Sequence, residues 1–296
     1  MVQRQSELEL AVTETVLAQP TKIRRNAKKK IRIRVWKTYR IVPWVLFTLL
    51  TSISIYTLLT MDYGEVVLLD ATRQFFTDLQ RIFLQPRLSG RFSFETLLQA
   101  LGMTVGLAVI TTLLGGVTAF LMALFTARNI SHSGPSNAIR TVMSFIRAVP
   151  TILWVMIFSI LIGLGANAAI IGMSFHTIAY LTKVFSESIE EIDSGVIEAL
   201  RACGASWWQV VFQAILPSCM TALLSWLFIR FEINFTNAIV VGAAAGAGGL
   251  GFQLAMTSSF YFDFHEIGVL VYMILAVVAI LEVVAIRLRK KYIIHA

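Results

Sequence analysis

The sequence predicts an all-α, polytopic membrane protein with six transmembrane helices, and two observations carry this prediction. Hydrophobic residues make up 57% of the 296 residues and charged residues only 14%, with a mean hydropathy of +0.75. A soluble domain has about 45–50% apolar and about 25% charged residues, so this chain lacks the polar groups to cover a globule in water. The apolar residues also form continuous runs, which favour helices over the alternating pattern of an outer-membrane barrel.

Six stretches approach the length of about 20 apolar residues that a helix needs to cross a bilayer. In chain order the expected spans are Ile41–Thr60, Leu97–Thr126, Thr141–Gly163, Ala166–Phe185, Val211–Phe231 and Glu266–Arg287. Between the first two, the segment Leu68–Leu84 places Phe75, Phe76, Leu79 and Phe83 at helical spacing. This pattern predicts a helix that lies on the outer surface of the membrane.

Basic residues set the expected orientation. Ten Lys or Arg residues and no acid lie between Lys22 and Arg40. By the positive-inside rule this side is cytoplasmic, and six crossings return the basic segment 287–291 to the same side. We therefore expect a basic cytoplasmic tail at 1–40, a transmembrane domain at 41–296 and both termini in the cytoplasm. The tail could also bind anionic lipid, although a tail that only sets orientation explains the same residues.

The composition argues against several other classes of protein. The net charge of +8 is concentrated at the membrane flanks, so nucleic acid is not an expected partner. Cys203 and Cys219 give neither a disulfide framework nor a metal-binding quartet. The segment Gly246–Gly251 fits GxGxxG, but no Rossmann strand precedes it, so we do not expect a dinucleotide site. The first apolar run begins some forty residues into the chain without a small-residue cleavage pattern, which argues against a cleaved signal peptide.

The loop between the expected fourth and fifth spans is too polar to cross lipid and falls on the cytoplasmic side. At about 187–217 it contains Glu198-Ala199, then Gly204 six residues after the Glu, and Leu216-Pro217 at its end. Small residues at helical spacing let another surface approach closely, and Gly204 lets the chain turn. We expect a short helix across the cytoplasmic face that is exposed to a partner. The alternative is an amphipathic loop helix without a partner.

This spacing resembles the EAA loop of ATP-binding-cassette (ABC) importer permeases. Three further strings, Phe145–Gly165, Ser174–Asp193 and Phe228–Leu254, are similar to the membrane subunit of phosphonate-type importers, a family of binding-protein-dependent transport inner membrane components. The similarity covers roughly the last two-thirds of the chain. One position departs from the pattern, because the family often has Ile where this chain has Ala214.

The resemblance implies a type I importer permease fold, similar to that of the methionine permeases (MetI-like), with a permease domain at 41–296. It assigns coupling to an ATPase to five residues: Glu198, Ala199, Gly204, Leu216 and Pro217. In proteins of this kind two permease subunits, here expected as a homodimer, form the pore in the bacterial plasma (inner) membrane. Two ATPase subunits bind ATP and Mg beneath them, and an external binding protein delivers the ligand. No cofactor is expected in this chain, which has no GxxxxGK[ST] phosphate loop.

Polar groups within the bilayer are candidates for the substrate path, because burying them in lipid is costly. The candidates are His176, Arg230, Glu232, Asn234, Gly246 and Gly248. Arg230 and His176 could attract a doubly charged phosphonate. The alternative for Arg230 is an internal ion pair with Glu232. For Lys183, near the end of the fourth span, we favour an ion pair with Glu187 over a role in transport.

Three functions compete. The first is a permease subunit that passes phosphonate or a related phosphorus oxyanion inward, and the second is a permease for methionine or another amino acid. The third is an integral-membrane enzyme, which would need a paired base and nucleophile or a metal cluster. The acids at 187–198 have no histidine nearby, so no catalytic or metal-binding residue is expected and the enzyme is the weakest of the three.

Overall fold

The computed structural model describes residues 38–62, 64 and 67–292. The chain divides into two units, residues 1–66 and 67–296. The first unit contains one described helix, α2 (Thr38–Thr60), whose segment Ile41–Thr60 has the length and hydropathy of a membrane span, as expected. Most of the basic tail expected at 1–40 lies outside the described residues.

The second unit is built from helices throughout its described residues. In chain order these are α3 (Leu68–Leu84), α4 (Phe94–Thr126), α5 (Ser133–Ala148), α6 (Thr151–Ile162), α7 (Ala166–Glu190), α8 (Ser194–Ala202), α9 (Trp207–Val210), a π-helical turn (Val211–Ile215), α10 (Leu216–Ala244), α11 (Gly249–Met256), a second π-helical turn (Thr257–Tyr261) and α12 (Phe264–Tyr292).

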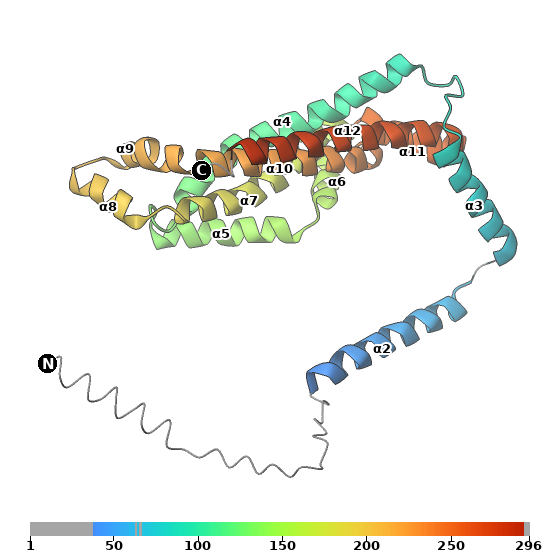
Figure 1. Ribbon diagram of the computed structural model, residues 1–296, viewed down its shortest axis with the longest axis horizontal. Coiled ribbons are helices and arrows are strands. Elements are labelled where there is room, and N and C mark those ends of the chain that lie inside the picture. The colour runs from blue at the N-terminus through green and yellow to red at the C-terminus, as the bar shows by residue number, and fades with distance from the viewer. Residues whose placement is uncertain (1–37, 63, 65–66, 293–296) are drawn as a thin grey trace, which may run out of the picture. The chain divides into compact units, whose positions relative to one another are not determined.

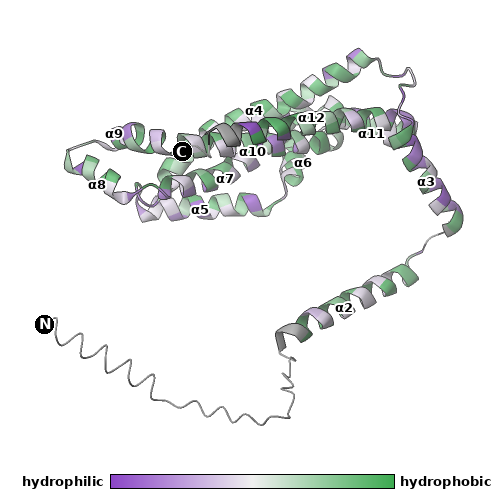
Figure 2. Cartoon of the chain, in the orientation of Figure 1, coloured by the Kyte–Doolittle hydropathy of each residue, from purple (hydrophilic) through white to green (hydrophobic). Residues whose placement is uncertain are grey.

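Helices α4, α7 and α10 form the centre of this unit, and each contacts the other two. Helices α8 and α9 lie at one end of the bundle, whereas α3 and α11 lie at the other (Figure 1). Apolar residues dominate α4 and α12, and polar residues are concentrated on α3 and α5 (Figure 2). Gly115 of α4 lies directly against Thr177 of α7, where a Cβ atom would overlap the threonine side chain. Small residues therefore let α4 and α7 approach closely.

Five helices in the described residues are long and apolar enough to cross a membrane, or six if one bent pair counts as a single span. The bent pair is α5 and α6, which meet at an angle of 91°. The span expected over Thr141–Gly163 is therefore formed by two helices that meet at a sharp bend and not by one straight helix. Pro150 has no N–H group and forces Val149 into an extended conformation (φ −93°, ψ 128°), so the helix ends there. The Trp154 indole then donates to the carbonyl of Ile146 at 2.9 Å across the bend.

The expected fifth span, Val211–Phe231, is too short by more than a dozen residues. The helical segment runs from Trp207 to Ala244. Residues 232–244 are apolar enough to continue the helix, and the chain first breaks where glycines at 246, 248 and 249 adopt positive φ. Arg230, which is the last residue but one of the expected span, consequently lies near the middle of α10, fourteen residues from each end.

Helix α3 has the bounds expected from the sequence, Leu68–Leu84. Its C-terminal carbonyl groups are held by α12, because the Tyr272 hydroxyl donates to Phe83 O and the His265 ring Nδ1 contacts Gln85 O, both at 2.7 Å. Phe75 and Phe76 remain exposed in this unit. These contacts satisfy carbonyls that a helix end leaves without partners and fix α3 to the start of α12.

Candidate functional site

The predicted coupling loop folds as a short helix, α8, with one buried and one exposed face. The Asp193 carboxylate caps its first turn by accepting from the backbone N–H of Gly195 at 2.9 Å. Ile197 is buried in the core formed with α4, α7 and α10, whereas Glu198 and Ala199 are exposed. The helix is thus anchored to the bundle by its buried face, and its polar and small residues are exposed on the opposite face.

Gly204 ends α8 in a Schellman motif. Its φ of +82° is in the left-handed region, its N–H donates to Arg201 O at 2.9 Å, and the next N–H, of Ala205, donates to Leu200 O at 3.0 Å. A Cβ atom at Gly204 would meet no atom within 4 Å. The sequence prediction that Gly204 turns the chain is confirmed, and the space beside it is open.

The far end of the loop is held by a tryptophan. The Trp207 indole donates to the carbonyl of Ile130 at 3.1 Å. A π-helical turn over Val211–Ile215 follows, and then Leu216, partly buried, and Pro217, exposed. Pro217 has no N–H to bond to the preceding turn, and the wider π turn accommodates it without ending the helix. Leu216 and Pro217 therefore lie at the start of α10, at the end of the bundle that carries α8 (Figure 1).

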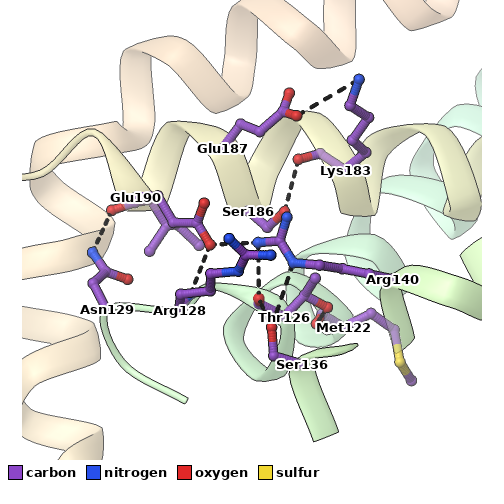
Figure 3. A network of polar contacts seen from close by, with 11 residues as sticks. Met122, Thr126, Arg128, Asn129, Ser136, Arg140, Lys183, Ser186, Glu187 and Glu190 are labelled. Atoms are coloured by element: carbon purple, nitrogen blue, oxygen red, sulfur yellow. Dashed lines mark hydrogen bonds and ion pairs between the residues drawn. The ribbon is translucent and has the colours of Figure 1, made fainter. Parts of the chain in front are cut away.

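A polar network supports the loop where α7 leads into it (Figure 3). The Arg140 guanidinium on α5 forms an ion pair with Glu190 at the end of α7 and donates to Thr126 O at 3.1 Å. The backbone N–H of Arg128 also donates to Glu190, at 2.7 Å, and the Ser136 hydroxyl donates to Thr126 O at 2.6 Å. These bonds join the ends of α4, α5 and α7 directly before α8 begins.

Two of the predicted path residues meet inside the bundle. Arg230 is 2% exposed, and Nη2 of its guanidinium lies 3.1 Å from Nδ1 of His176. Its Nε and Nη2 both donate to the Thr177 hydroxyl, and its Cζ lies 5.1 Å from the centre of the Tyr180 ring. A guanidinium can only donate, so Nδ1 of His176 accepts and the proton of a neutral imidazole is on Nε2.

Asn234, another predicted path residue, extends this cluster one turn further along α10. Its Nδ2 donates to the Thr112 hydroxyl at 2.9 Å, and its Oδ1 lies 3.2 Å from the Thr177 hydroxyl oxygen. The threonines and Tyr180 were missed by the sequence reasoning. Their residue types gave no signal, since threonine is common in apolar helices and usually bonds to its own helix.

Three further charged residues were considered in the sequence, Lys183 and Glu187 on α7 and Glu232 on α10. Lys183 and Glu187 form the expected ion pair at 3.6 Å. Glu232 lies on α10 and is partly buried; its pairing with Arg230 stays a prediction. Within the described part of the chain, no group of three or more His, Cys, Asp or Glu side chains could hold a metal ion.

Gly246 and Gly248 lie in the turn between α10 and α11, with φ of +60° and +79°. Arg230 is about 21 Å from the end of α10 at 1.5 Å per residue, so these glycines and the Arg230 cluster do not form one site. The turn lets α11 fold back onto α10, where Gly251 lies against the carbonyl of Ile239. The positive φ of Gly246 and Gly248 thus lets the backbone bend, and the absence of a side chain at Gly251 lets the two helices pack closely.

A bundle of apolar helices that carries an anchored loop helix with one exposed face is the architecture of a multi-pass membrane protein. Residues 119–291 match the family described as "Binding-protein-dependent transport system inner membrane component". The match covers more than half of the chain, and the chain belongs to this family. It is therefore a permease component of an ABC importer and not an enzyme, as the sequence indicated.

Two permeases of known name are similar to this chain. Phosphate-import permease protein PhnE of Mycolicibacterium smegmatis is 30% identical over 236 residues, which cover 78% of this chain and 42% of that protein. Phosphite transport system permease protein PtxC of Stutzerimonas stutzeri is 30% identical over 64% of this chain and 68% of its own length. The chain thus spans less than half the length of the first relative and about two-thirds of the second.

The fold is that of a solved permease. A structure described as inward facing conformations of the MetNI methionine ABC transporter superimposes with a TM-score of 0.60 at 19% identity, over 67% of this chain and 97% of that one. The MetI-like fold expected from the resemblance is confirmed.

Proposed function

We propose that the importer served by this chain carries phosphonate or a related phosphorus oxyanion inward. The observation that carries the proposal is the sequence similarity to a phosphite permease over about two-thirds of both chains. The relatives named for phosphate and phosphite import both fit one chemical class of cargo.

The outward face of α8 is the proposed docking surface for the ATPase. Glu198, Ala199 and Gly204 are all exposed, and Gly204 has open space beside it. Small residues at this face let a partner surface approach the backbone closely, while the buried Ile197 and the Arg140–Glu190 pair transmit a push on α8 to α7. ATP and Mg are bound by that partner, and this chain supplies no cofactor.

Arg230 and His176 are the proposed attraction point for the cargo, and Asn234 and Glu232 lie beside them on α10. Arg230 is buried in the present arrangement. Its contacts with Thr177 and His176 span α7 and α10, so a separation of these two helices would expose the guanidinium to an anion. Gly246 and Gly248, which follow the C-terminal end of α10, would line the opening of the substrate path at that end of the bundle.

The remaining parts of the proposal concern assembly and orientation. A second copy of the chain completes the pore, and an external binding protein delivers the ligand at the end of the bundle that carries α11. Both termini are cytoplasmic in the bacterial inner membrane, with α3 on lipid at the outer surface. Labelling of a cysteine placed at Ser206 with an impermeant reagent tests this orientation. In sealed cells that cysteine reacts only if the α8 end of the bundle lies outside the cell.

The test of the function is reconstitution. The chain is placed in liposomes with its ATPase and with the external binding protein, and uptake of phosphonate, phosphite, phosphate and methionine is measured with and without ATP. ATP-dependent uptake of a phosphorus oxyanion is expected. Uptake of methionine alone would show that the cargo assignment is wrong while the permease assignment holds.

A further inference from the structure

A cleft of about 170 Å³ opens between α5 and α7, on the side of the bundle that carries the loop helix. Helix α5 lines it with Arg140 and Arg147, and α7 lines it with Thr182, Lys183 and Ser186. The liquid volume of one water is about 30 Å³, so the cleft has room for a small tetrahedral anion with some of its hydration. It is separate from the exposed face of α8 and borders the Arg230 cluster, because the backbone of Arg147 is hydrogen-bonded to His176.

The walls of this cleft carry more positive than negative charge. Three cations line it and one acid, Glu187. The contacts of the Arg147 guanidinium are with its own helix, to Met143 O at 3.4 Å and to the Ser144 hydroxyl at 3.2 Å. Lys183 is within 3.6 Å of Glu187, but the two side chains are 47% and 48% exposed, so this pair holds the ammonium group only weakly. Arg147 and Lys183 are therefore available to an anion.

Thr182 provides an independent observation. It is fully buried, it lines the cleft, and its hydroxyl has no hydrogen-bond partner. The other buried threonines of the described residues all donate to the carbonyl four residues earlier; they are Thr104, Thr111, Thr112, Thr126, Thr177 and Thr257. Among the buried threonines of the described residues, Thr182 is the one whose hydroxyl does not form this bond. A buried hydroxyl without a partner costs free energy, which a ligand that accepts its proton would restore.

We propose that this cleft binds a phosphate-type oxyanion. Such an anion accepts hydrogen bonds on all sides, which suits donors that stand on two facing walls, Thr182 and Lys183 on α7 and Arg147 on α5. The anion can be free inorganic phosphate or the headgroup of an anionic phospholipid. The walls of the cleft include none of the proposed path residues, but Arg147 contacts His176 through its backbone, so Thr182→Val is the variant that separates this site from the cargo path.

The test measures thermal unfolding of the full chain in nanodiscs of phosphatidylcholine as inorganic phosphate is titrated at low millimolar concentration, against chloride at equal ionic strength. A saturable rise in Tm is expected for the wild type. Thr182→Val should weaken phosphate binding about fivefold and Arg147→Gln about tenfold, because each removes a donor to the anion. Without phosphate, Thr182→Val should melt at or above the wild-type Tm, since it removes an unsatisfied hydroxyl.

The matched control is Thr111→Val. Thr111 is equally buried but does not line the cleft, and its hydroxyl donates to Leu107 O at a distance of 2.7 Å. It should keep the wild-type phosphate affinity. If the occupant is a lipid headgroup, discs that contain phosphatidylglycerol should stabilise the wild type more than Thr182→Val, and phosphate should add little. The proposal is overturned if neither phosphate nor phosphatidylglycerol stabilises the wild type, or if both cleft variants respond as the wild type does.

Discussion

Arg230 of α10 and Thr177 of α7 are joined by two hydrogen bonds inside the bundle, from Nε at 3.2 Å and from Nη2 at 3.1 Å to the same hydroxyl oxygen. Thr177 is fully buried and Arg230 nearly so. The other two contacts described for the guanidinium, with His176 and with the Tyr180 ring, are also with neutral groups. These contacts from α7 offset part of the cost of burying the guanidinium inside the bundle.

Loss of the Thr177 hydroxyl should therefore weaken the contact between α7 and α10. Thr177→Val removes the acceptor of two guanidinium bonds, and we expect it to lower stability by about 1–3 kcal/mol. Arg230→Met removes the buried charge together with its bonds. The double variant should cost clearly less than the sum of the two single variants, because the hydroxyl matters mainly while the guanidinium is present. Thermal unfolding of the purified protein in detergent measures all three.

Thr118→Val is the control for this cycle, because its hydroxyl bonds only to Leu114 O of its own helix, at 2.8 Å. It should change stability little. Strict additivity of Arg230→Met and Thr177→Val would show that the two side chains do not act together. Normal uptake by a well-folded Arg230→Met protein would argue against the cargo role of Arg230.

The close contact between α10 and α11 gives a second prediction. A Cβ atom on Gly251 would overlap the backbone carbonyl of Ile239, which no side-chain rotation relieves. Gly251→Ala should therefore destabilise the protein by about 3 kcal/mol or more, since backbone atoms must move. Gly106→Ala on α4, where a Cβ atom meets nothing within 4 Å, should be neutral or stabilising by up to about 1 kcal/mol. Equal melting temperatures for the two variants would contradict the close approach.

The sequence predicted those features that depend only on residues close to one another in the chain. The apolar runs located α2, α4, α7 and α12, and the spacing of Glu198 and Gly204 located an exposed loop helix, because hydropathy and chain reversal are local properties. The bend at Pro150 carried its own signal, but the apolar run on both sides of it, Thr141–Gly163, dominated the prediction.

Contacts between helices could not be predicted in the same way. Thr177 binds Arg230 from 53 positions away, and Thr112 binds Asn234 across 122. Which residue faces which depends on the rotation and depth of each helix, and those are set by small residues such as Gly115 at the contact. Arg230 and His176 were recognised as candidates because charge in lipid is rare, whereas a threonine in the same place gives no such signal.

The start of α12 gives a pH prediction. The Asp263 carboxylate accepts from the backbone N–H groups of His265 and Glu266, at 3.1 and 3.2 Å. Partial burial favours the neutral acid, but the nearby Ser89 hydroxyl, these two bonds and the charge of Arg91 together hold the pKa of Asp263 below its usual 3.8. The unfolded chain therefore binds the proton more readily than the folded one, so the stabilisation is present above about pH 4 and is lost as pH falls through the folded pKa.

Asp263→Asn keeps an acceptor for the helix cap but removes the charge. At pH 7 the wild type should be the more stable protein by a few tenths to about 1 kcal/mol, and the difference should shrink as the pH is lowered below 4. Melting temperatures of both proteins across pH 3 to 7 measure it. A difference that stays constant over this range would show that the charge of Asp263 contributes nothing to the cap.

Gly204 gives the most direct test of coupling to the ATPase. Any side chain here is strained by the φ of +82°, so Gly204→Asn, which tolerates this conformation best, is the control for Gly204→Glu. Both should fold alike, because a Cβ atom meets nothing within 4 Å in this chain. If α8 docks an ATPase, the longer and charged glutamate should meet the partner surface, so Gly204→Glu should lose most ATP-driven uptake and copurify with less ATPase, whereas Gly204→Asn should keep most of both. Equal uptake and equal ATPase recovery for the two variants would place the docking surface elsewhere than at the end of α8.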